Sequence, residues 1–218
     1  MLILHDYLPS QNAWKVRQLL AHLDVPYRQQ FVAIFDGGGR TDAFLANNPT
    51  GAVPVLELES GDCLAESNAI LCYLADGTRY LPDDRWLRAQ VVRWLCFEAD
   101  YVQSSVATLR HWTLTGKTSR RDPAVVEGKR NASIKMLGML ERHLCGRADS
   151  DNAFLVGNAY TIADIAVFAY VHLANDAEIA LQDFPMLAAW ITRVRSQPAH
   201  LAQVFPYSID PHSERELP

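Results

Sequence analysis

Residues 48–57 read Asn48-Pro49-Thr50-Gly51-Ala52-Val53-Pro54-Val55-Leu56-Glu57, and residues 66–70 read Glu66-Ser67-Asn68-Ala69-Ile70. Pro54 begins a short apolar run, and a proline, which lacks a backbone N–H, is tolerated only at the start or the edge of a strand. If the Val53–Pro54 bond is cis, the N–H and C=O of Val53 turn outward and can pair with an extended ligand. Ser67 begins a stretch with helical spacing of apolar residues, where a hydroxyl and free N–H groups favour a bound carboxylate. The two segments indicate a clamp for a small peptide-like ligand; the alternative is a plain turn followed by a helix cap.

Elements typical of a small α/β domain precede this clamp. Residues 2–5 and 27–33 have the pattern of strands, and a glycine-rich loop at 36–40 leads to a short helix near 42–46. Between the strands, one face of an expected helix carries Ala13, Val16, Leu19, Leu20 and Leu23, and the opposite face carries Lys15, Arg17, Gln18 and His22. The order through about residue 80 is β-α-β-α-β-β-α.

Four motifs occur in order along the chain. They are Ser10-Gln11-Asn12 with Lys15-Val16-Arg17, residues 48–54, residues 66–70 followed by Tyr73-Leu74, and Thr161-Ile162-Ala163-Asp164. Together they resemble the cytosolic glutathione S-transferase family in its bacterial, serine-type form, and they span nearly the whole chain. The resemblance implies a thioredoxin-like α/β N-terminal domain with a cis-proline, joined to an all-α C-terminal domain.

Glycine and proline residues mark the expected boundary between these domains. They interrupt the helical pattern over residues 78–84, which predicts a linker there. The thioredoxin-like, glutathione-binding domain is then expected to cover residues 1–77, and the all-helical domain residues 85–218.

Start signals and spacing predict the helices of the second domain. One helix is expected over residues 85–114 with Asp84 as its cap, and another over residues 122–144, begun by Asp122-Pro123. The spacing of a core face is found at Ile134, Leu137, Leu140 and Leu144. Residues 161–164 have the spacing of a capping box, so Asp164 is expected to be structural.

Composition limits the classes of function. The chain has 218 residues, of which 49% are hydrophobic, enough for a substantial core in one large domain or two small ones. A net charge of -5 argues against a nucleic-acid partner, because phosphate binding requires a clustered excess of Lys and Arg. The N-terminus lacks a signal-peptide pattern, and no apolar run approaches the roughly 20 residues that span a bilayer. A cytoplasmic protein with no membrane partner is therefore expected.

The cysteines and histidines follow no metal-binding pattern. Cys63, Cys72, Cys96 and Cys145 are too scattered for a zinc site or a CxxC pair and are expected to be reduced. The histidines show no HxxxH or HExxH spacing. No metal is expected, and no cofactor beyond glutathione as a co-substrate.

The family resemblance implies a site that activates a thiol. A free thiol with a pKa near about 8.5 is only a few per cent thiolate at pH 7, so the site must stabilise the anion. Ser10, at the start of the first helix, is expected to donate a hydrogen bond to the sulfur, with Asn12 as a second donor and the helix dipole as support. Tyr7 is the rival, because some classes of the family use a tyrosine just after the first strand. Ser10 as a helix cap alone is the other alternative, and both roles can coexist.

The remaining glutathione contacts follow from the same resemblance. Val53, before Pro54, is expected to pair with the cysteinyl backbone, while Glu66 and Ser67 bind the γ-glutamyl end. Arg40, beside three glycines, is expected to reach the glycyl carboxylate; a solvated surface arginine is the alternative.

The expected second substrate is a hydrophobic electrophile. Its pocket is expected between the domains, lined by Tyr7, Leu8, Tyr101, Leu109 and Trp112. The alternative is that these are ordinary core residues.

Three functions remain open at this point. The first is a transferase that adds glutathione to the electrophile, the second a glutathione-dependent disulfide reductase or isomerase on the same fold, and the third a non-catalytic binding or regulatory protein. The polar set of Ser10, Val53-Pro54 and Glu66-Ser67 argues against the third, because a pure scaffold needs no ligand-facing polar groups.

A homodimer is also expected. The family generally forms dimers, and the helix from Arg85 carries an apolar stripe with Trp86, Val92 and Trp94 that one subunit is not expected to bury entirely.

Overall fold

The computed structural model describes residues 1–147 and 154–218 and divides into two compact units. The first unit holds Met1–Asp76 and Pro198–Pro218, and the second holds Gly77–Gln197. The C-terminal segment Pro198–Pro218 differs from the sequence expectation, which assigned it to the helical domain.

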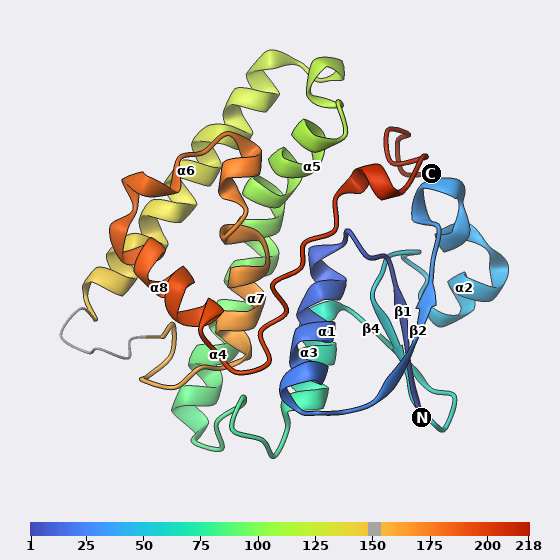
Figure 1. Cartoon of the computed structure of the whole chain (residues 1–218), viewed down its shortest axis with the longest axis horizontal. Coiled ribbons are helices and arrows are strands. Elements are labelled where there is room, and N and C mark those ends of the chain that lie inside the picture. Colours follow the sequence, from blue (N-terminus) through green and yellow to red (C-terminus); the bar gives the residue numbers. More distant parts are fainter. Residues whose placement is uncertain (148–153) are drawn as a thin grey trace. The chain divides into compact units, whose positions relative to one another are not determined.

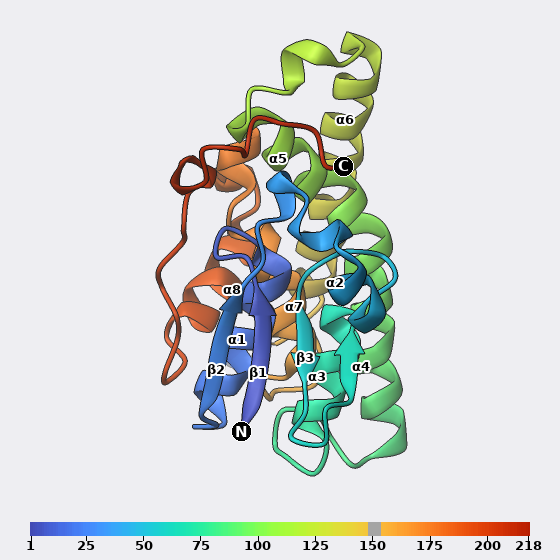
Figure 2. The same ribbon diagram turned by 90° about the vertical axis from the view of Figure 1, so that its right-hand side faces the viewer.

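The first unit is built on a four-stranded mixed sheet with the order β2-β1-β3-β4 (Figure 2). β1 (Leu2–Asp6) and β2 (Tyr27–Phe31) pair in parallel, and β3 (Val55–Glu57) and β4 (Cys63–Ala65) extend the sheet with antiparallel pairs. Parallel neighbours require a crossover connection, which here contains α1 (Gln11–His22). The predicted thioredoxin-like architecture is confirmed.

Helices cover both faces of the sheet. α1 and α3 (Ser67–Ala75) lie side by side on one face, and α2 (Asp42–Asn47) lies on the other (Figure 1). The core on the α1 and α3 side contains Leu4, Val16, Leu20, Leu56 and Ile70, all fully buried. Beneath α2, Phe44 packs with Val32 and Val55. Because successive side chains of a strand point to opposite faces, Leu4 enters the first core and His5 faces the side of α2.

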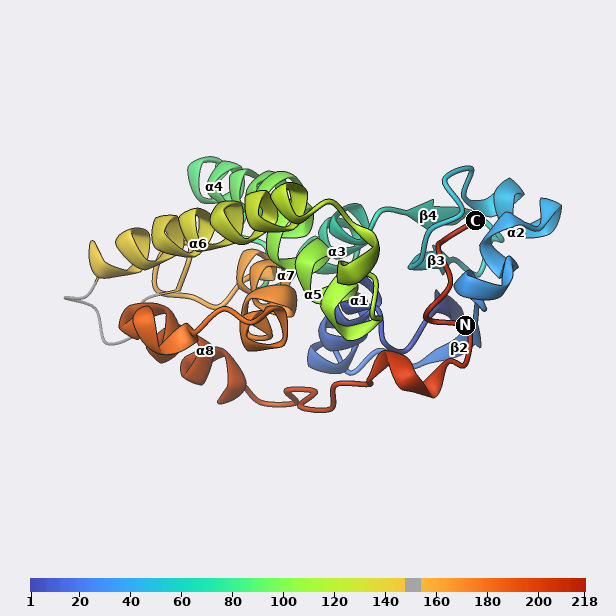
Figure 3. The same ribbon diagram turned by 90° about the horizontal axis from the view of Figure 1, so that it is seen from above.

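The second unit is helical. Its α-helices are α4 (Arg85–Phe97), α5 (Thr108–Leu114), α6 (Pro123–Cys145), α7 (Ile162–Val171) and α8 (Pro185–Arg195). α7 is central: every one of its residues is buried, and it packs against α4 and α8 (Figure 3). Within the residues that the structure describes, no helix is both long and apolar enough to cross a membrane.

The predicted helix starts of this unit are confirmed. The Asp84 carboxylate accepts from the backbone N–H of Leu87 at 2.8 Å, and that of Asp122 accepts from Ala124 at 2.8 Å. Thr161 and Asp164 form the expected capping box. These signals are local in sequence, which is why they were readable without a structure.

The helix expected over residues 85–114 is helical throughout but does not have one winding. Between α4 and α5, Glu98–Ala107 is π-helical. The hydroxyls of Ser104 and Ser105 donate to the carbonyls of Asp100 and Tyr101, four residues earlier. Such side-chain bonds compete with the backbone ladder and distort helices. The predicted helix is confirmed over its whole length, with a π-helical segment that the sequence did not reveal.

One residue expected in the core of α6 lies at the surface. Leu137, Leu140 and Leu144 are buried as predicted, but Ile134 is 45% exposed. The buried face of α6 includes Ser133 and Met136 instead, so Ile134 lies outside that face.

Side chains of α1 hold the C-terminal segment against the first unit. The Gln18 amide donates to the carbonyl of Ala199 at 3.1 Å and accepts from the N–H of Leu201 at 2.8 Å. The Trp14 indole donates to the carbonyl of Leu201 at 3.0 Å. These long-range bonds explain why the segment belongs to the first unit.

Candidate functional site

The Asn48 side chain shapes the turn that begins the clamp. Its amide donates to the carbonyl of Ala52 at 2.8 Å and accepts from the backbone N–H of Thr50 at 3.1 Å. Gly51 has a φ of 71°, a conformation that favours glycine. The turn also touches the glycine-rich loop, since a Cβ on Gly39 would lie 2.2 Å from the carbonyl oxygen of Gly51. Only a glycine at position 39 allows the two loops to approach so closely.

The Val53–Pro54 peptide bond is cis, as the family resemblance implied. Val53 is half-buried and stands just before β3. Among the described residues, neither its backbone N–H nor its C=O forms a hydrogen bond. Its backbone can therefore pair with an extended ligand.

Ser10 caps α1. Its hydroxyl oxygen accepts from the backbone N–H of Ala13 at 3.3 Å, and its own N–H donates to the carbonyl of Tyr7 at 2.8 Å. A hydroxyl carries one proton and two lone pairs. Because the cap uses a lone pair, the Ser10 proton is not spent on it, and capping is compatible with donation to a ligand.

A cavity of about 280 Å³ brings together four of the residues predicted to bind or activate glutathione: Ser10, Asn12, Arg40 and Val53. The turn residues 50–52 form another part of its wall. The C-terminal segment also contributes to the lining, through Leu217 and Pro218. The cavity thus lies at the N-terminus of α1, beside an open backbone edge.

Arg40 is held at this cavity by backbone oxygens. Its Nη1 donates to the carbonyl of Thr50 and its Nε to the oxygen of Pro218, each at 2.9 Å. An exposed arginine at this place brings a positive charge to a cavity lined mainly by neutral residues.

Glu66 and Ser67 lie at the start of α3 and do not line that cavity. α3 begins at Ser67, as predicted, but the cap position belongs to Glu66, whose side chain makes no capping bond. Glu66 has a φ of 67°, a rare conformation for a residue with a side chain, and such residues gather at binding sites. Ser67 is 6% exposed, and its hydroxyl accepts from the Lys15 ammonium at 3.3 Å.

Sequence reasoning missed the burial of the polar side of α1. Lys15, Arg17 and Gln18 are all buried, although helical periodicity set them opposite the apolar face. Arg17 donates to both carboxylate oxygens of Asp6, at 2.6 and 2.7 Å, and to the carbonyl of Leu8 at 3.0 Å. The sequence signal for this burial was the grouping of three long polar side chains, Lys15, Arg17 and Gln18, within four positions of one helix.

Tyr7 has a different environment from Ser10. The residue is 1% exposed and does not line the cavity with Ser10. Burial, and next the neighbouring carboxylate of Asp210, raise the pKa of Tyr7 far above its ordinary range. A phenol of this kind holds its proton tightly.

The residues expected around the electrophile have varied environments in their own units. Leu8 is half-buried in the first unit. In the second, Leu109 is fully buried, Tyr101 is 53% exposed, and Trp112 lies under the guanidinium of Arg121, 5.2 Å from its ring. Leu109 fits the core alternative, and the pocket as a whole stays a prediction.

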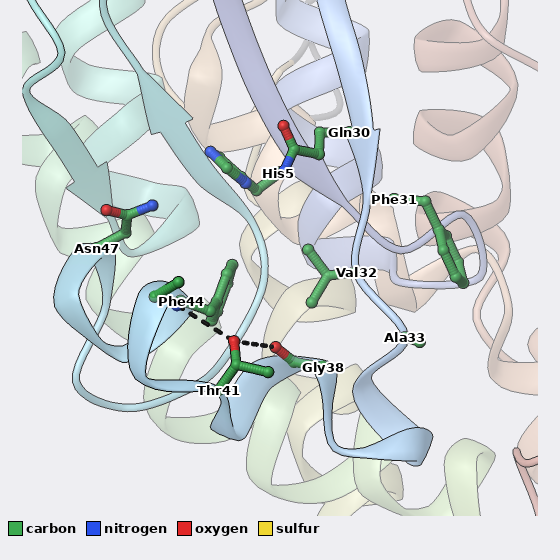
Figure 4. Close-up of a pocket in the computed structure, with 10 residues that line it drawn as sticks. His5, Gln30, Phe31, Val32, Ala33, Gly38, Thr41, Phe44 and Asn47 are labelled. Atoms are coloured by element: carbon green, nitrogen blue, oxygen red, sulfur yellow. Dashed lines mark hydrogen bonds between the residues drawn. The ribbon is translucent and has the colours of Figure 1, made fainter.

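A second cavity of the first unit, about 210 Å³, lies on the side of the sheet covered by α2. Figure 4 shows His5, Gln30 and Asn47 around it, with Thr41 bonded to Phe44 and Gly38. None of the predicted site residues lines this cavity. In residues 1–147 and 154–218, no three His, Cys, Asp or Glu side chains form a group able to hold a metal ion.

Two models of the glutathione S-transferase family match the chain. The N-terminal domain model matches residues 1–76, and a C-terminal domain model matches residues 115–202. Glutathione S-transferase 1 of Schizosaccharomyces pombe is 30% identical, with 91% of this chain and 93% of that protein covered. The disulfide-bond oxidoreductase YfcG of Escherichia coli is 26% identical over 88% and 90% of the two chains.

A solved structure agrees with these matches. The crystal structure of a glutathione S-transferase from Pseudomonas fluorescens has a TM-score of 0.86 and 39% identity, and the match covers 92% of this chain and 97% of the other. The thioredoxin-like sheet of the first unit and the helical second unit agree with these likenesses. The chain belongs to the glutathione S-transferase family.

Proposed function

We propose that this protein is a glutathione transferase that activates the glutathione thiol with Ser10 and transfers glutathione to a hydrophobic electrophile. The observation that carries the proposal is the shared cavity of Ser10, Asn12, Arg40 and Val53 at the N-terminus of α1. It combines a hydroxyl donor, an open backbone edge and a cation, which match the thiol, the cysteinyl backbone and the glycyl carboxylate of glutathione.

The geometry at Ser10 is suited to a thiolate. The Ser10 hydroxyl caps the helix through a lone pair, so its proton is available to the sulfur. The positive end of the α1 dipole acts in the same direction. Lowering a thiol pKa by one to two units requires about 1.4 to 2.7 kcal/mol, within the range of one charge-assisted hydrogen bond plus a dipole. Asn12, in the same cavity, is the second donor.

Tyr7 is less suited to this role. Its pKa is raised by burial and by Asp210, and its position is outside the cavity. The serine is therefore the better activating group of the two.

The ultraviolet absorbance of the thiolate, measured against pH in the glutathione complex, tests the assignment. Ser10→Ala should raise the pKa of bound glutathione and lower turnover at pH 7 more than it lowers glutathione affinity, because the interaction is with the anion. Tyr7→Phe should change that pKa much less. A shift in Tyr7→Phe with none in Ser10→Ala would transfer the role to the tyrosine.

Thr41→Ala is the matched control for lost capping. Thr41 caps α2 in the same unit and accepts from the N–H of Phe44 at 3.3 Å, as Ser10 does from Ala13. It does not line the cavity of Ser10. A thiolate pKa that moved equally in both variants would reduce the effect of Ser10 to helix capping.

A glutathione-dependent disulfide reductase or isomerase is the second candidate, favoured by the likeness to YfcG. No cysteine lines the cavity of Ser10, so glutathione itself would supply the sulfur. A panel of aryl halides, epoxides, isothiocyanates and organic disulfides separates the two activities. Turnover of disulfides alone would replace the transferase proposal with this one.

A homodimer in the cytoplasm completes the proposal. On α4, Trp86 is 69% and Val92 45% exposed, although Trp94 is buried. Large apolar groups exposed on one helix favour a partner surface. A solution mass of only 24.4 kDa at micromolar concentration would exclude the dimer.

A further inference from the structure

The Lys15 side chain on α1 is a cation with no exposed surface. It is among the largest fully buried side chains of the protein. Lysine is almost never fully buried unless it is paired, since removing an ammonium group from water is costly. A neutral chain such as methionine would fill the same core position without that cost, so the charge needs an explanation.

One hydrogen bond of Lys15 points to that explanation. Its ammonium donates to the hydroxyl oxygen of Ser67 at 3.3 Å, joining the middle of α1 to the first residue of α3. An ammonium group has three donors and no acceptor. In this bond Ser67 can only accept, so the single proton of its hydroxyl must point elsewhere.

We propose that Lys15 is a positioning residue that makes Ser67 an obligate hydrogen-bond donor and thereby selects the γ-glutamyl α-carboxylate of glutathione. The inference rests on the proposed function and on the expectation, implied by the family resemblance, that Ser67 binds the γ-glutamyl end of glutathione. Ser67 is itself 6% exposed, so a ligand oxygen bound there lies in a site of low effective dielectric. The charge of Lys15 acts strongly across one hydroxyl in such surroundings.

The backbone around Ser67 supports the same polarity. The first N–H groups of a helix have no acceptor within it, and Glu66 provides no side-chain cap. The N-terminus of α3 therefore adds positive potential beside Ser67. Without Lys15, the Ser67 hydroxyl could turn its lone pairs toward the ligand and weaken the selection for an anion.

The test compares glutathione with γ-aminobutyryl-cysteinyl-glycine, which is glutathione without the γ-glutamyl α-carboxylate. The wild type should bind glutathione more tightly by about tenfold or more, the usual range for a charge-assisted hydrogen bond. Lys15→Met should reduce this preference to less than about threefold and leave the affinity for the analogue nearly unchanged. Calorimetry gives all four dissociation constants.

Gln18→Met is the matched control. Gln18 is also fully buried on α1, but its amide bonds to the C-terminal segment instead of Ser67. If Lys15 mattered only for the packing of α1, both variants would lower the affinity for both ligands in parallel. Such a parallel loss, with the preference for glutathione intact in Lys15→Met, would overturn the inference.

The wild type and Ser67→Ala keep the test decisive even if Lys15→Met does not fold. Ser67→Ala should lose the preference for glutathione over the analogue, because it removes the donor that Lys15 orients. A wild type that binds both ligands equally would refute the role of Lys15 while leaving glutathione binding in place. A wild type that binds neither ligand would refute the proposed function and this inference together.

Discussion

The two units of the molecule bury an aspartate in two different ways. In the first, Asp6 faces a cation: Arg17 contacts both of its carboxylate oxygens, and the amide of Gln29 donates to one of them. In the second, Asp164 is fully buried and accepts only from neutral groups of the described residues. These are the backbone N–H groups of Leu155 and Thr161, the indole of Trp190 and the hydroxyl of Thr161.

The difference lies in what compensates the charge. At Asp6, a charge of opposite sign offsets the cost of burial, and the same guanidinium also fixes the Leu8 carbonyl beside the first loop. At Asp164, neutral hydrogen-bond donors offset the cost of burying the charge, and only in part. Burial raises the pKa of Asp164 from 3.8 to about 6, although all of its hydrogen bonds act to lower it. The first arrangement secures the loop that carries Ser10, and the second joins α7 to α8.

Removing the cation from the first arrangement should have the largest effect. Arg17→Met leaves the Asp6 carboxylate buried and uncompensated, which typically costs about 3 to 5 kcal/mol. The double variant Arg17→Met with Asp6→Asn should recover part of that loss, because the uncompensated charge is gone. Urea unfolding followed by circular dichroism measures both. A single variant as stable as the wild type would show that Asp6 does not depend on Arg17.

Removing the carboxylate from the second arrangement should be nearly as damaging. Asp164→Ala leaves the donors of Leu155, Thr161 and Trp190 in a dry interior without an acceptor. Each buried donor without a partner costs roughly 1 to 3 kcal/mol, so a total loss of about 3 kcal/mol or more is expected. Asp122→Ala is the control, since it removes an exposed cap on α6 and should cost only about 1 kcal/mol. Equal losses in the two variants would contradict the picture of Asp164 as a buried hub.

The same contrast shows which parts of the structure were readable from sequence. The capping box at Thr161 and Asp164 was predicted, because its partners lie three residues apart. The caps Asp84 and Asp122 were also readable from short motifs, whereas the cis form of the Val53–Pro54 bond followed only from the family resemblance. The bonds of Asp164 to Leu155 and Trp190 were not, because nothing local identifies these partners.

The polar side of α1 shows where prediction from sequence periodicity fails near the candidate site. Periodicity describes where apolar residues lie, and it set Lys15 and Gln18 opposite them. Their burial depends on Ser67 and on residues 199 and 201, which are distant in sequence. Four of the site residues expected from the sequence line one cavity. The contact between Lys15 and Ser67, in contrast, could be found only in the structure. Long-range hydrogen-bond partners, which periodicity does not reveal, account for the difference.

The pH dependence of stability should follow the second arrangement. Because the folded pKa of Asp164 is raised, folding favours its protonated form, and this contribution is complete below about pH 3.8 and lost as the pH rises through about 6. The interval between 3.8 and about 6 corresponds to roughly 3 kcal/mol. Asp164→Asn cannot titrate, so the difference in unfolding free energy between wild type and variant should change over this interval and be flat above it. A difference that is constant from pH 4 to pH 7 would contradict the raised pKa.

An exposed pair of the same residue types should have the smallest effect and completes the comparison. Arg215 contacts Asp36 at 2.7 Å, a distance close to that between Arg17 and Asp6, but its side chain is 56% and that of Asp36 53% exposed. Water and salt screen such a pair, and holding two long side chains in one geometry costs entropy, so the net contribution is about 0 to 1 kcal/mol. Arg215→Met should therefore change the unfolding free energy by less than about 1 kcal/mol, several times less than Arg17→Met. The measurement is urea unfolding of both variants at low and at high salt, where the small effect of Arg215→Met should shrink further and that of Arg17→Met should persist. Losses of similar size in the two variants would mean that burial does not control the strength of the Arg–Asp pair in this protein, and the contrast between Asp6 and Asp164 would then need a cause other than charge compensation.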